Sequence, residues 1–335
     1  MIKNLLALSV TVLTLLCFSN AFGKPPCDVT GAVYEWTDCV GESYGKDGFF
    51  YRGEFLDGKP SGLGEERITS HRWHKGEFLN DRFHGLGARF DVVAGSIIIG
   101  RWVEGKLTVG FVTSPHGNYF GKWKNQKFDG EGIWVSADNQ ISFGLWQDGN
   151  LIEDYLSEES SKYCGDNNSL NNCAAKLGTD EEMVVGFFRK RNLQGLGYFK
   201  DKSRHVFGFH TDSKLVGNAL TISNQGTIHF GEVQENGVPS GWGVSVNQSN
   251  VLISGIGFHE ADGSLSGNGA MWVDRTDGKI LSELSSYYGK MRSAAAYGAG
   301  LKIGKDGHFY YGRWSNDLPN IEGFSVADDG KYVGE

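Results

Sequence analysis

The sequence has little proline, cysteine or methionine: its 335 residues include 6 Pro, 5 Cys and 4 Met. It also lacks an excess of positive charge, because 32 Lys and Arg residues stand against 40 Asp and Glu residues. A chain without a basic surface has no electrostatic basis for binding DNA or RNA. Low proline without a three-residue glycine period also excludes a collagen-like chain.

Glycine is the residue in excess, with 49 of 335 positions, about twice the usual share. A glycine inside a helix costs about 1 kcal/mol, so this composition disfavours a long helical bundle. Aromatic residues make up 13% of the chain, which is too many for a disordered glycine-rich linker. The composition therefore predicts a β-rich, turn-rich protein.

Long hydrophobic runs are also scarce, and the only one lies at the start of the chain. Lys3 precedes an apolar stretch, Leu5 to Phe18, and the small residues Ala21 and Gly23 follow it. This order is typical of a secretory signal peptide, which we expect over residues 1–23. An uncleaved anchor is the alternative, but the run is shorter than the ~20 residues of a comfortable membrane span. We expect an exported chain that is periplasmic, in the cell envelope or secreted.

Export changes what the cysteines predict. Cys17 would leave with the signal peptide, so four would remain: Cys27, Cys39, Cys164 and Cys173. An even number in an oxidising compartment indicates disulfides, and the local pairs 27–39 and 164–173 are the simplest of three pairings. A zinc site is the alternative, but neither loop has C-x2-C spacing or contains a histidine.

A short motif repeats along the chain. An aromatic-Gly-aromatic segment, Tyr51 to Phe55, leads through the turn residues Asp57 and Gly58 to a Gly-x-Gly pair. The motif recurs about every 23 residues, in eleven copies and a truncated twelfth. Its glycines are Gly53, Gly62, Gly64, Gly76, Gly85, Gly87, Gly121, Gly130, Gly132, Gly186, Gly195, Gly197, Gly231, Gly241, Gly243, Gly289, Gly298, Gly300 and Gly312.

This pattern resembles the MORN repeat family, whose unit reads roughly Y-x-G-x-W-x-x-G-x-x-x-G-x-G. The resemblance covers residues ~50–335 except 151–182, and repeats three, five, nine and eleven depart from the pattern in their second half. A WD40 propeller is the competing repeat fold, but its period of about 40–45 residues and its Gly-His and Trp-Asp signatures do not match. The resemblance implies an elongated sheet of tandem hairpins.

The residue spacing independently supports a β-hairpin in each repeat. Tyr51, Gly53 and Phe55 share one face of a strand, and the glycine leaves a floor on which a neighbouring ring can lie. Asp57-Gly58 is a hairpin turn signal. A single hairpin cannot bury its face, so the repeats must stack. We therefore expect an all-β fold: an elongated, single-layer, twisted antiparallel sheet of ~23-residue hairpins.

The repeats divide the chain into segments. After the signal peptide we expect a disulfide-bearing cap over residues 24–49, since repeat arrays need their ends shielded. Repeats one to five then occupy 50–150, and repeats six to twelve occupy 183–335. Between them, residues 151–182 form an insert containing the second disulfide loop. Its first part could be a short helix, and Asp166 with Asn168 suggests a calcium loop, although no terminal Glu follows.

One feature goes beyond the generic repeat. The residue before the first glycine of each repeat faces the opposite side of the sheet. It is Arg52 and Lys75 in the first two repeats. Later it becomes an aromatic column of Phe120, Phe143, Phe207, Phe230, Tyr288 and Tyr311. Either a curled sheet or a partner sheet covers this column, or it is an exposed contact surface for a protein or a glycan.

The sequence contains no recognisable catalytic motif. The histidines are scattered, and His74 and His229 simply replace the tyrosine of a repeat. We expect no enzyme, no cofactor and no metal, but an exported scaffold for unknown protein partners, with self-association possible through the last repeats because an open sheet edge invites pairing. An envelope-surface module binding lipid or glycan is the alternative, although the net charge of −8 gives membrane binding no support.

Overall fold

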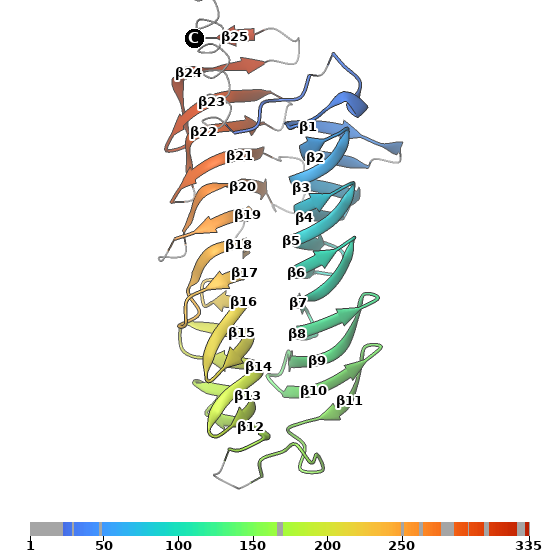
Figure 1. Ribbon diagram of the computed structural model, residues 1–335, viewed down its shortest axis with the longest axis vertical. Helices are drawn as coiled ribbons and strands as arrows, with labels where there is room; N and C mark the ends of the chain where they lie inside the picture. Colours follow the sequence, from blue (N-terminus) through green and yellow to red (C-terminus); the bar gives the residue numbers. More distant parts are fainter. Residues whose placement is uncertain are drawn as a thin grey trace, which may run out of the picture.

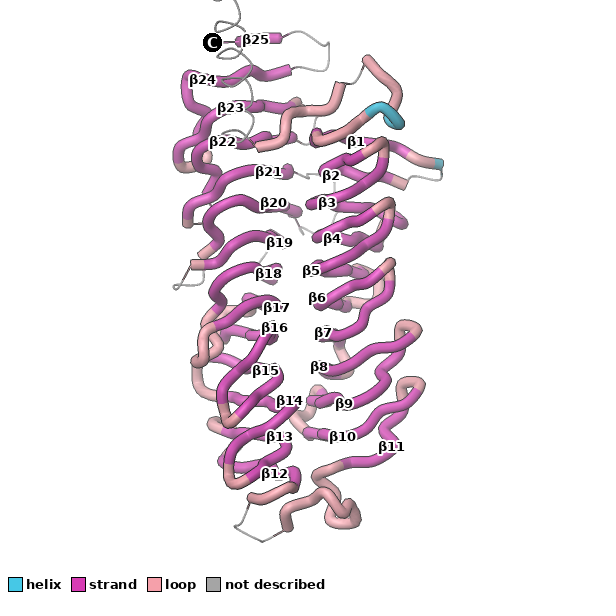
Figure 2. Tube along the Cα trace, in the orientation of Figure 1, coloured by secondary structure: helices cyan, strands magenta, loops and turns pink. Residues whose placement is uncertain are grey.

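The computed structural model describes residues 23–28, 30–46, 49–165, 170–248, 251–260, 264–275, 285–293, 295–304, 308–326 and 332–334. Most of the expected signal peptide, residues 1–22, lies outside this set, as do Asp166 and Asn168 of the suggested calcium loop. The described part is almost entirely strand (Figure 2). Its only helix is a 3-10 turn, Val33–Glu35, so no described helix could cross a membrane.

The strands form two antiparallel sheets in which each strand pairs with its neighbours in sequence (Figure 1). The N-terminal sheet contains β1 (Cys39–Tyr44), β2 (Phe50–Leu56), β3 (Lys59–Thr69), β4 (Arg72–Leu79), β5 (Arg82–Asp91), β6 (Ser96–Val103), β7 (Lys106–Ser114), β8 (Gly117–Lys124), β9 (Lys127–Ser136), β10 (Ile141–Gln147) and β11 (Asn150–Asp154). The C-terminal sheet contains β12 (Cys173–Gly178), β13 (Met183–Arg189), β14 (Asn192–Lys200), β15 (Arg204–Thr211), β16 (Lys214–Ser223), β17 (Thr227–Val233), β18 (Pro239–Gln248), β19 (Val251–His259), β20 (Leu265–Arg275), β21 (Ser285–Arg292), β22 (Ala295–Ile303), β23 (Phe309–Ser315), β24 (Leu318–Val326) and β25 (Tyr332–Gly334).

The two glycines of each Gly-x-Gly pair have different physical roles. Gly195 has φ 69°, and a Cβ there would meet no atom within 4 Å, so only its left-handed backbone requires glycine. It lies where the β13–β14 register shifts, as in a β-bulge. By contrast, a Cβ on Gly87 would collide with the ring of Phe83. Gly195 therefore permits the bend in its strand, and Gly87 makes room for an aromatic ring.

The face that carries the repeat aromatics, here called the repeat face, has its own core. In the first repeats this core includes Tyr51, Phe55, Phe78 and Trp102. Tyr51 packs edge-on against Phe55 and Phe78 at ring centroid distances of 5.2 and 5.0 Å. Polar atoms at the ring edges also find partners, because Tyr51 Oη donates to the Glu54 carbonyl at 3.0 Å and Trp102 Nε1 to the Gly87 carbonyl at 3.2 Å. The expected glycine floor under aromatic rings is present.

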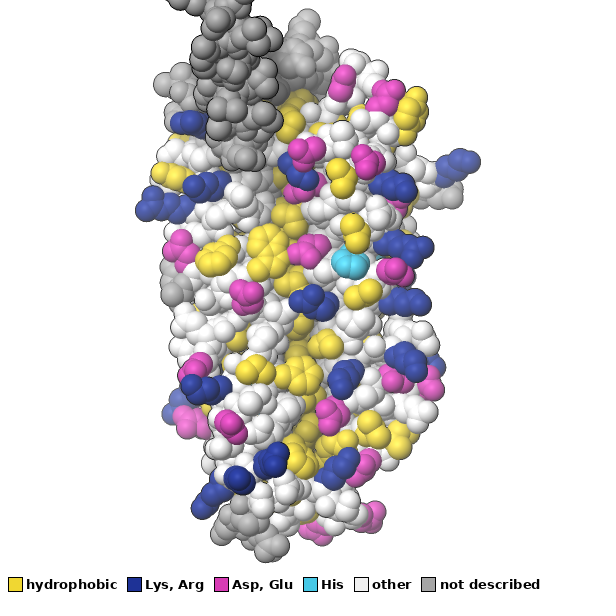
Figure 3. Space-filling view, in the orientation of Figure 1, with side chains coloured by type: hydrophobic (Ala, Val, Ile, Leu, Met, Phe, Trp, Pro, Cys, Tyr) yellow, Lys and Arg dark blue, Asp and Glu magenta, His cyan; other side chains and the backbone are white. Residues whose placement is uncertain are grey.

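The opposite faces of the two sheets pack against each other. The chain reverses after β11, so the sheets run side by side with β11 and β12 together at one end (Figure 1). The strands that approach across the interface are β9 with β14, β5 with β18, β4 with β19 and β3 with β20. The strand numbers of each pair add to 23. A band of hydrophobic side chains follows the seam between the sheets on the face shown in Figure 3.

The all-β class and the tandem hairpins are confirmed, and the structure adds a second layer. Each sheet is a single layer of hairpins, but the molecule is not one continuous layer, because the two sheets bury their facing sides against each other. The expectation of a helix in the insert is wrong for its described part. Leu151 to Asp154 belong to β11, and residues 173–178 form β12. The insert therefore comprises most of edge strand β11, the crossing from one sheet to the other, and edge strand β12.

Candidate functional site

The predicted aromatic column lies between the sheets. Phe120 is fully buried and approaches Phe207 and Phe230 of the other sheet, with ring centroids 5.8 and 6.4 Å apart. Phe143 is buried against Tyr155, at 5.2 Å. The structure therefore buries these phenylalanine rings under the facing sheet, whereas Tyr288 and Tyr311 of the column line a cavity that is described below.

The first two members of the column, which are Arg52 and Lys75, form a buried polar section of the same interface. Glu65 lies between them with its side chain fully buried. The Arg52 Nη1 group donates to Ser286 Oγ at 3.1 Å, and Ser286 Oγ donates to Glu65 Oε1 at 2.7 Å. Lys75 Nζ lies 3.6 Å from Glu65 Oε2, and Arg52 also pairs with Glu42. Two cations thus face two carboxylates, so the section is balanced in charge.

This polar section links the sheets through main chain as well as side chains. Tyr288 Oη donates to the Arg52 carbonyl at 2.9 Å, and Trp272 Nε1 donates to Tyr288 Oη at 3.2 Å. Burial acts to lower the pKa of Arg52, but the charges of Glu65 and Glu42 outweigh it and raise that pKa above its ordinary value. The guanidinium therefore stays charged inside the interface.

Both predicted disulfides are present, and each ties a segment to an edge strand. Cys27–Cys39 joins the segment 23–28, here called the strap, to the start of β1, where Pro26 forms a parallel bridge with Val40. Cys164–Cys173 joins the crossing segment to the start of β12, where Tyr163 bridges Ala174. A covalent staple thus holds a cover on one edge strand of each sheet, which is how repeat arrays protect exposed edges.

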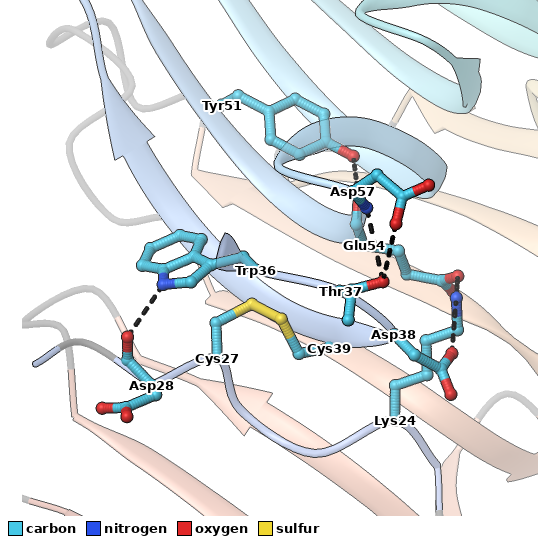
Figure 4. The surroundings of a disulfide bond; sticks show 10 residues. All are labelled: Lys24, Cys27, Asp28, Trp36, Thr37, Asp38, Cys39, Tyr51, Glu54 and Asp57. Atoms are coloured by element: carbon cyan, nitrogen blue, oxygen red, sulfur yellow. Dashed lines mark hydrogen bonds and ion pairs between the residues drawn. A yellow bond between two sulfur atoms is a disulfide. The ribbon is translucent and has the colours of Figure 1, made fainter. Parts of the chain in front are cut away.

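Side-chain contacts fix the cap around the first disulfide (Figure 4). Trp36 Nε1 donates to the Asp28 carbonyl at 2.8 Å, and the Trp36 ring packs edge-on against Phe55 at 5.0 Å. Lys24 Nζ lies 2.7 Å from a Glu54 carboxylate oxygen and 3.5 Å from one of Asp38. Burial acts to lower the pKa of Lys24, but these carboxylates outweigh it and raise the pKa. The predicted cap is thus a packed unit that includes β1.

A cavity of about 1070 Å³ opens between the sheets beside the strap, and we call it the cap cleft. The strap and the N-terminal sheet contribute Lys24, Asp38 and Glu54 to it. The C-terminal sheet contributes Trp242, Asn268, Lys290 and Tyr311, together with Gly267, Gly269 and Gly289. Trp242 Nε1 is held by Glu77 of the other sheet at 2.6 Å. The cap cleft therefore combines aromatic side chains, both signs of charge and main chain at the three glycines.

A second unusual cluster lies on the repeat face of the C-terminal sheet, away from the cap cleft. Ser245 Oγ lies 2.9 Å from His229 Nδ1 and 2.9 Å from His259 Nε2. Both histidines are buried, each with 1% of its surface exposed. Within the described residues, no group of three or more His, Cys, Asp and Glu side chains is placed to hold a metal ion.

Sequence reasoning found the column and the disulfides but missed the cap cleft and this cluster. Of the predicted contact column, only Tyr311 and Tyr288 reach the cap cleft. Trp242, Asn268 and Lys290 come from three different strands, and no short motif joins them. The sequence did contain a signal for this cluster: Ser245 follows the repeat glycine Gly243 by two positions, and His259 follows Gly257 in the same way, which places both on the repeat face.

Comparison with protein families identifies the repeat. The model of the MORN repeat matches residues 51–70, 74–89 and 119–141. These segments span β2 with β3, most of β4 with β5, and β8 with β9, so each match covers one hairpin. A comparison with curated protein sequences returned no match.

Proposed function

Because the chain contains MORN repeats, we propose that it is an exported, non-catalytic scaffold that holds protein partners, and that the cap cleft is its main contact site. A repeat fold alone is weak evidence for function, since one fold serves many functions. The proposal therefore depends on the site and on the two disulfides, which are typical of proteins in an oxidising compartment.

The single observation that supports the contact site is the cap cleft itself. Elsewhere along the seam the two sheets bury facing aromatic side chains such as Phe111, Phe120, Phe207 and Phe230 against each other. At the cap end the cavity exposes Asn268 and Lys290 and half-exposes Trp242 and Tyr311. Concave sites with a few polar groups among aromatic rings are typical binding sites.

Capture from envelope extract tests the proposal. The bait is the chain from residue 24 onward, with its disulfides formed, in the wild-type form and as Asn268→Arg, which places a long cation in the cap cleft. The matched control is Asn150→Arg, an exposed Asn on β11 at the other end of the molecule.

We expect a specific partner that wild type and Asn150→Arg retain and Asn268→Arg loses, with equal thermal unfolding midpoints for all three. Equal capture by all three proteins would contradict the cap cleft as the contact site. If the chain is found only in the cytoplasm with reduced cysteines, the exported scaffold is wrong.

A further inference from the structure

The C-terminal sheet extends beyond the N-terminal sheet at the cap end. The N-terminal sheet has 11 strands and the C-terminal sheet 14, a difference of 14 − 11 = 3. Because facing strands have numbers that add to 23, β22 lies opposite β1 and three strands remain: β23, β24 and β25. Figure 1 shows β23 to β25 lying past the level of β1. No described strand of the N-terminal sheet faces them.

The strap lies next to β23, β24 and β25 and shows what kind of ligand this surface binds. Tyr311 Oη of β23 donates to the carbonyl of Gly23, the last residue of the expected signal peptide, at 2.8 Å. The chain from residue 24 onward lacks this contact, which leaves the Tyr311 position to another main-chain carbonyl. Gly23 lies directly over the β21–β22 main chain, since a Cβ built on it would be 3.4 Å from Gly300 Cα and 3.5 Å from Gly289 Cα. In the full chain, the inter-sheet side of the C-terminal sheet thus binds one extended stretch of main chain, through the Tyr311 hydrogen bond and close contact with the main chain of β21 and β22.

The remaining part of the cap cleft continues the same surface. Gly267 and Gly269 of β20 also line it, beside the exposed Asn268. A Cβ on Gly269 or Gly289 would point to the repeat face, toward Met291 or Tyr287, so these glycines contribute main chain to the cleft. The charged rim contains Lys24 and Lys290 with Asp38 and Glu54, so its charges cancel and it offers no preference for a phosphate or a nucleic acid.

We propose that the cap cleft binds an extended polypeptide segment of a partner protein, which lies beside the strap along β20 to β23 and continues the layer that the N-terminal sheet provides elsewhere. This inference rests on the proposed function and specifies its ligand. The surface is continuous with the interface between the sheets. Asn268 supplies side-chain hydrogen bonds to the main chain of the segment, as does Tyr311 in the chain that begins at Lys24 and lacks Gly23.

Selection from a library of linear peptides tests the ligand class. Peptides of about eight residues, which span about 26 Å when extended, are displayed on phage and selected on the chain from residue 24 onward. The affinity of a selected peptide is then measured by fluorescence anisotropy for wild type, Asn268→Arg, Tyr311→Phe and Asn150→Arg. We expect at least a tenfold loss for Asn268→Arg, a smaller loss for Tyr311→Phe and none for Asn150→Arg.

Two results would overturn the inference. The first is that the selected peptides bind the Asn268→Arg variant as tightly as they bind wild type. The second is that the selection yields no binding peptide, while an envelope oligosaccharide binds in a way that depends on Asn268. The second result would reject a polypeptide as the ligand but keep the cap cleft as a contact site. By contrast, equal capture of the partner by wild type and Asn268→Arg would reject the cap cleft as the contact site.

A second inference rests on a different observation, the hydrogen-bond contacts of the two histidine rings in this cluster. His229 Nε2 lies 3.2 Å from the Glu232 carbonyl, and His259 Nδ1 lies 3.2 Å from the Gly257 carbonyl. A carbonyl only accepts hydrogen bonds, so each of these nitrogens carries the proton of its neutral ring. The other two ring nitrogens, His229 Nδ1 and His259 Nε2, are then acceptors, and both face Ser245 Oγ at 2.9 Å.

Ser245 cannot satisfy both rings, because a hydroxyl has one proton to donate. In the neutral cluster one of the two short contacts therefore contains no hydrogen. One added proton completes the chain: the protonated ring donates to Ser245 Oγ, and Ser245 donates to the other ring. We propose that His229, Ser245 and His259 form a binding site for a single proton that the two rings share.

The surroundings contain few competing charges. His229 lies on β17, with Thr221 of β16 opposite it, and Leu265 of β20 lies opposite His259 of β19. The Glu232 carboxylate accepts from the Trp242 amide at 3.1 Å, and the exposed Glu260 follows β19. Burial, as the larger cause, and the charge of His259 together lower the pKa of His229 to about 3, and the hydrogen bond to the Glu232 carbonyl acts in the opposite direction. Burial also lowers the pKa of His259, and hydrogen bonds to the Gly241 and Gly257 main chain act in the opposite direction.

NMR titration of labelled histidine rings tests the proton site in wild type, Ser245→Ala and Ser245→Thr. We expect both ring signals of wild type to move at one midpoint while the circular dichroism stays native. In Ser245→Ala the midpoint falls by about one pH unit, a tenfold loss in proton affinity, and Ser245→Thr restores it. Independent midpoints that Ser245→Ala leaves unchanged would overturn the site, as would uptake that coincides with global unfolding.

Discussion

The interface between the two sheets has an aromatic half and a polar half. In the middle, Phe111, Phe120, Phe207 and Phe230 bury their rings against one another. At the cap end, Arg52, Glu65, Lys75 and Ser286 occupy the same faces. Aromatic burial is favourable in any of several registers, whereas a buried ion pair is favourable only when its partners meet. We interpret the aromatic half as the source of stability and the polar half as the part that sets the register.

Truncating an aromatic side chain in the middle should have the largest effect. Phe207→Ala removes a buried ring that contacts Phe111, Phe120 and Tyr198. The lost contacts and the cavity predict a loss of about 3–5 kcal/mol in the free energy of unfolding. Chemical denaturation measures this. A loss below about 1 kcal/mol, as for an exposed ring, would contradict the packed interface.

Removing the central carboxylate should be nearly as damaging for a different reason. Glu65→Leu leaves the Arg52 and Lys75 cations buried without their shared partner, and we expect a loss of about 3 kcal/mol. The triple variant Arg52→Met, Glu65→Leu, Lys75→Met should recover most of this stability, because no buried charge remains at these positions. If the triple variant is less stable than Glu65→Leu, the polar half contributes stability and our comparison fails.

Removing either disulfide should have a smaller effect on the free energy of unfolding, and the two disulfides should affect different parts of the molecule. Replacing Cys27 and Cys39 by Ser opens a loop of 12 residues and should cost about 2–3 kcal/mol. It should also free the strap, so hydrogen exchange should increase at Val40, whose amide donates to the Pro25 carbonyl at 2.8 Å. The matched control, Cys164 and Cys173 to Ser, should leave exchange at Val40 unchanged. Equal hydrogen exchange at Val40 in the two double variants would show that the Cys27–Cys39 disulfide does not hold the strap on β1.

The smallest effect is the response to pH, and it should differ between the sheets. Burial lowers the pKa values of His205, His210, His229 and His259 in the C-terminal sheet, but only of His74 in the N-terminal sheet. A lowered folded-state pKa means that the unfolded chain binds protons first, so stability present above pH 6.5 decreases as the pH falls toward the folded-state values. Hydrogen exchange corrected for intrinsic rates, at pH 7 and pH 5, should show greater loss of protection in the C-terminal sheet. Equal loss in both sheets would contradict this.

Much of the local structure was predictable because the repeat determines it locally. Glycine and aromatic spacing predicted the hairpins, and the loop cysteines predicted both disulfides. The reversal of the chain was not predictable, since Phe120 reads the same whether another sheet of the chain or a partner covers it. The cap cleft depends on the difference in strand number and on the strap, and no short motif encodes either. The proton site depends on Ser245 meeting two rings from neighbouring strands.

The central claim is that the two sheets of one chain cover each other, and a cross-link across the seam tests it most directly. A photoreactive benzoylphenylalanine replaces Phe120, the monomeric protein is irradiated, and the linked peptides are identified by mass spectrometry. The structure predicts links from position 120 to β15 and β17, near Phe207 and Phe230. Links confined to the neighbouring strands β7 and β9 would show that this face is open, and would contradict the account.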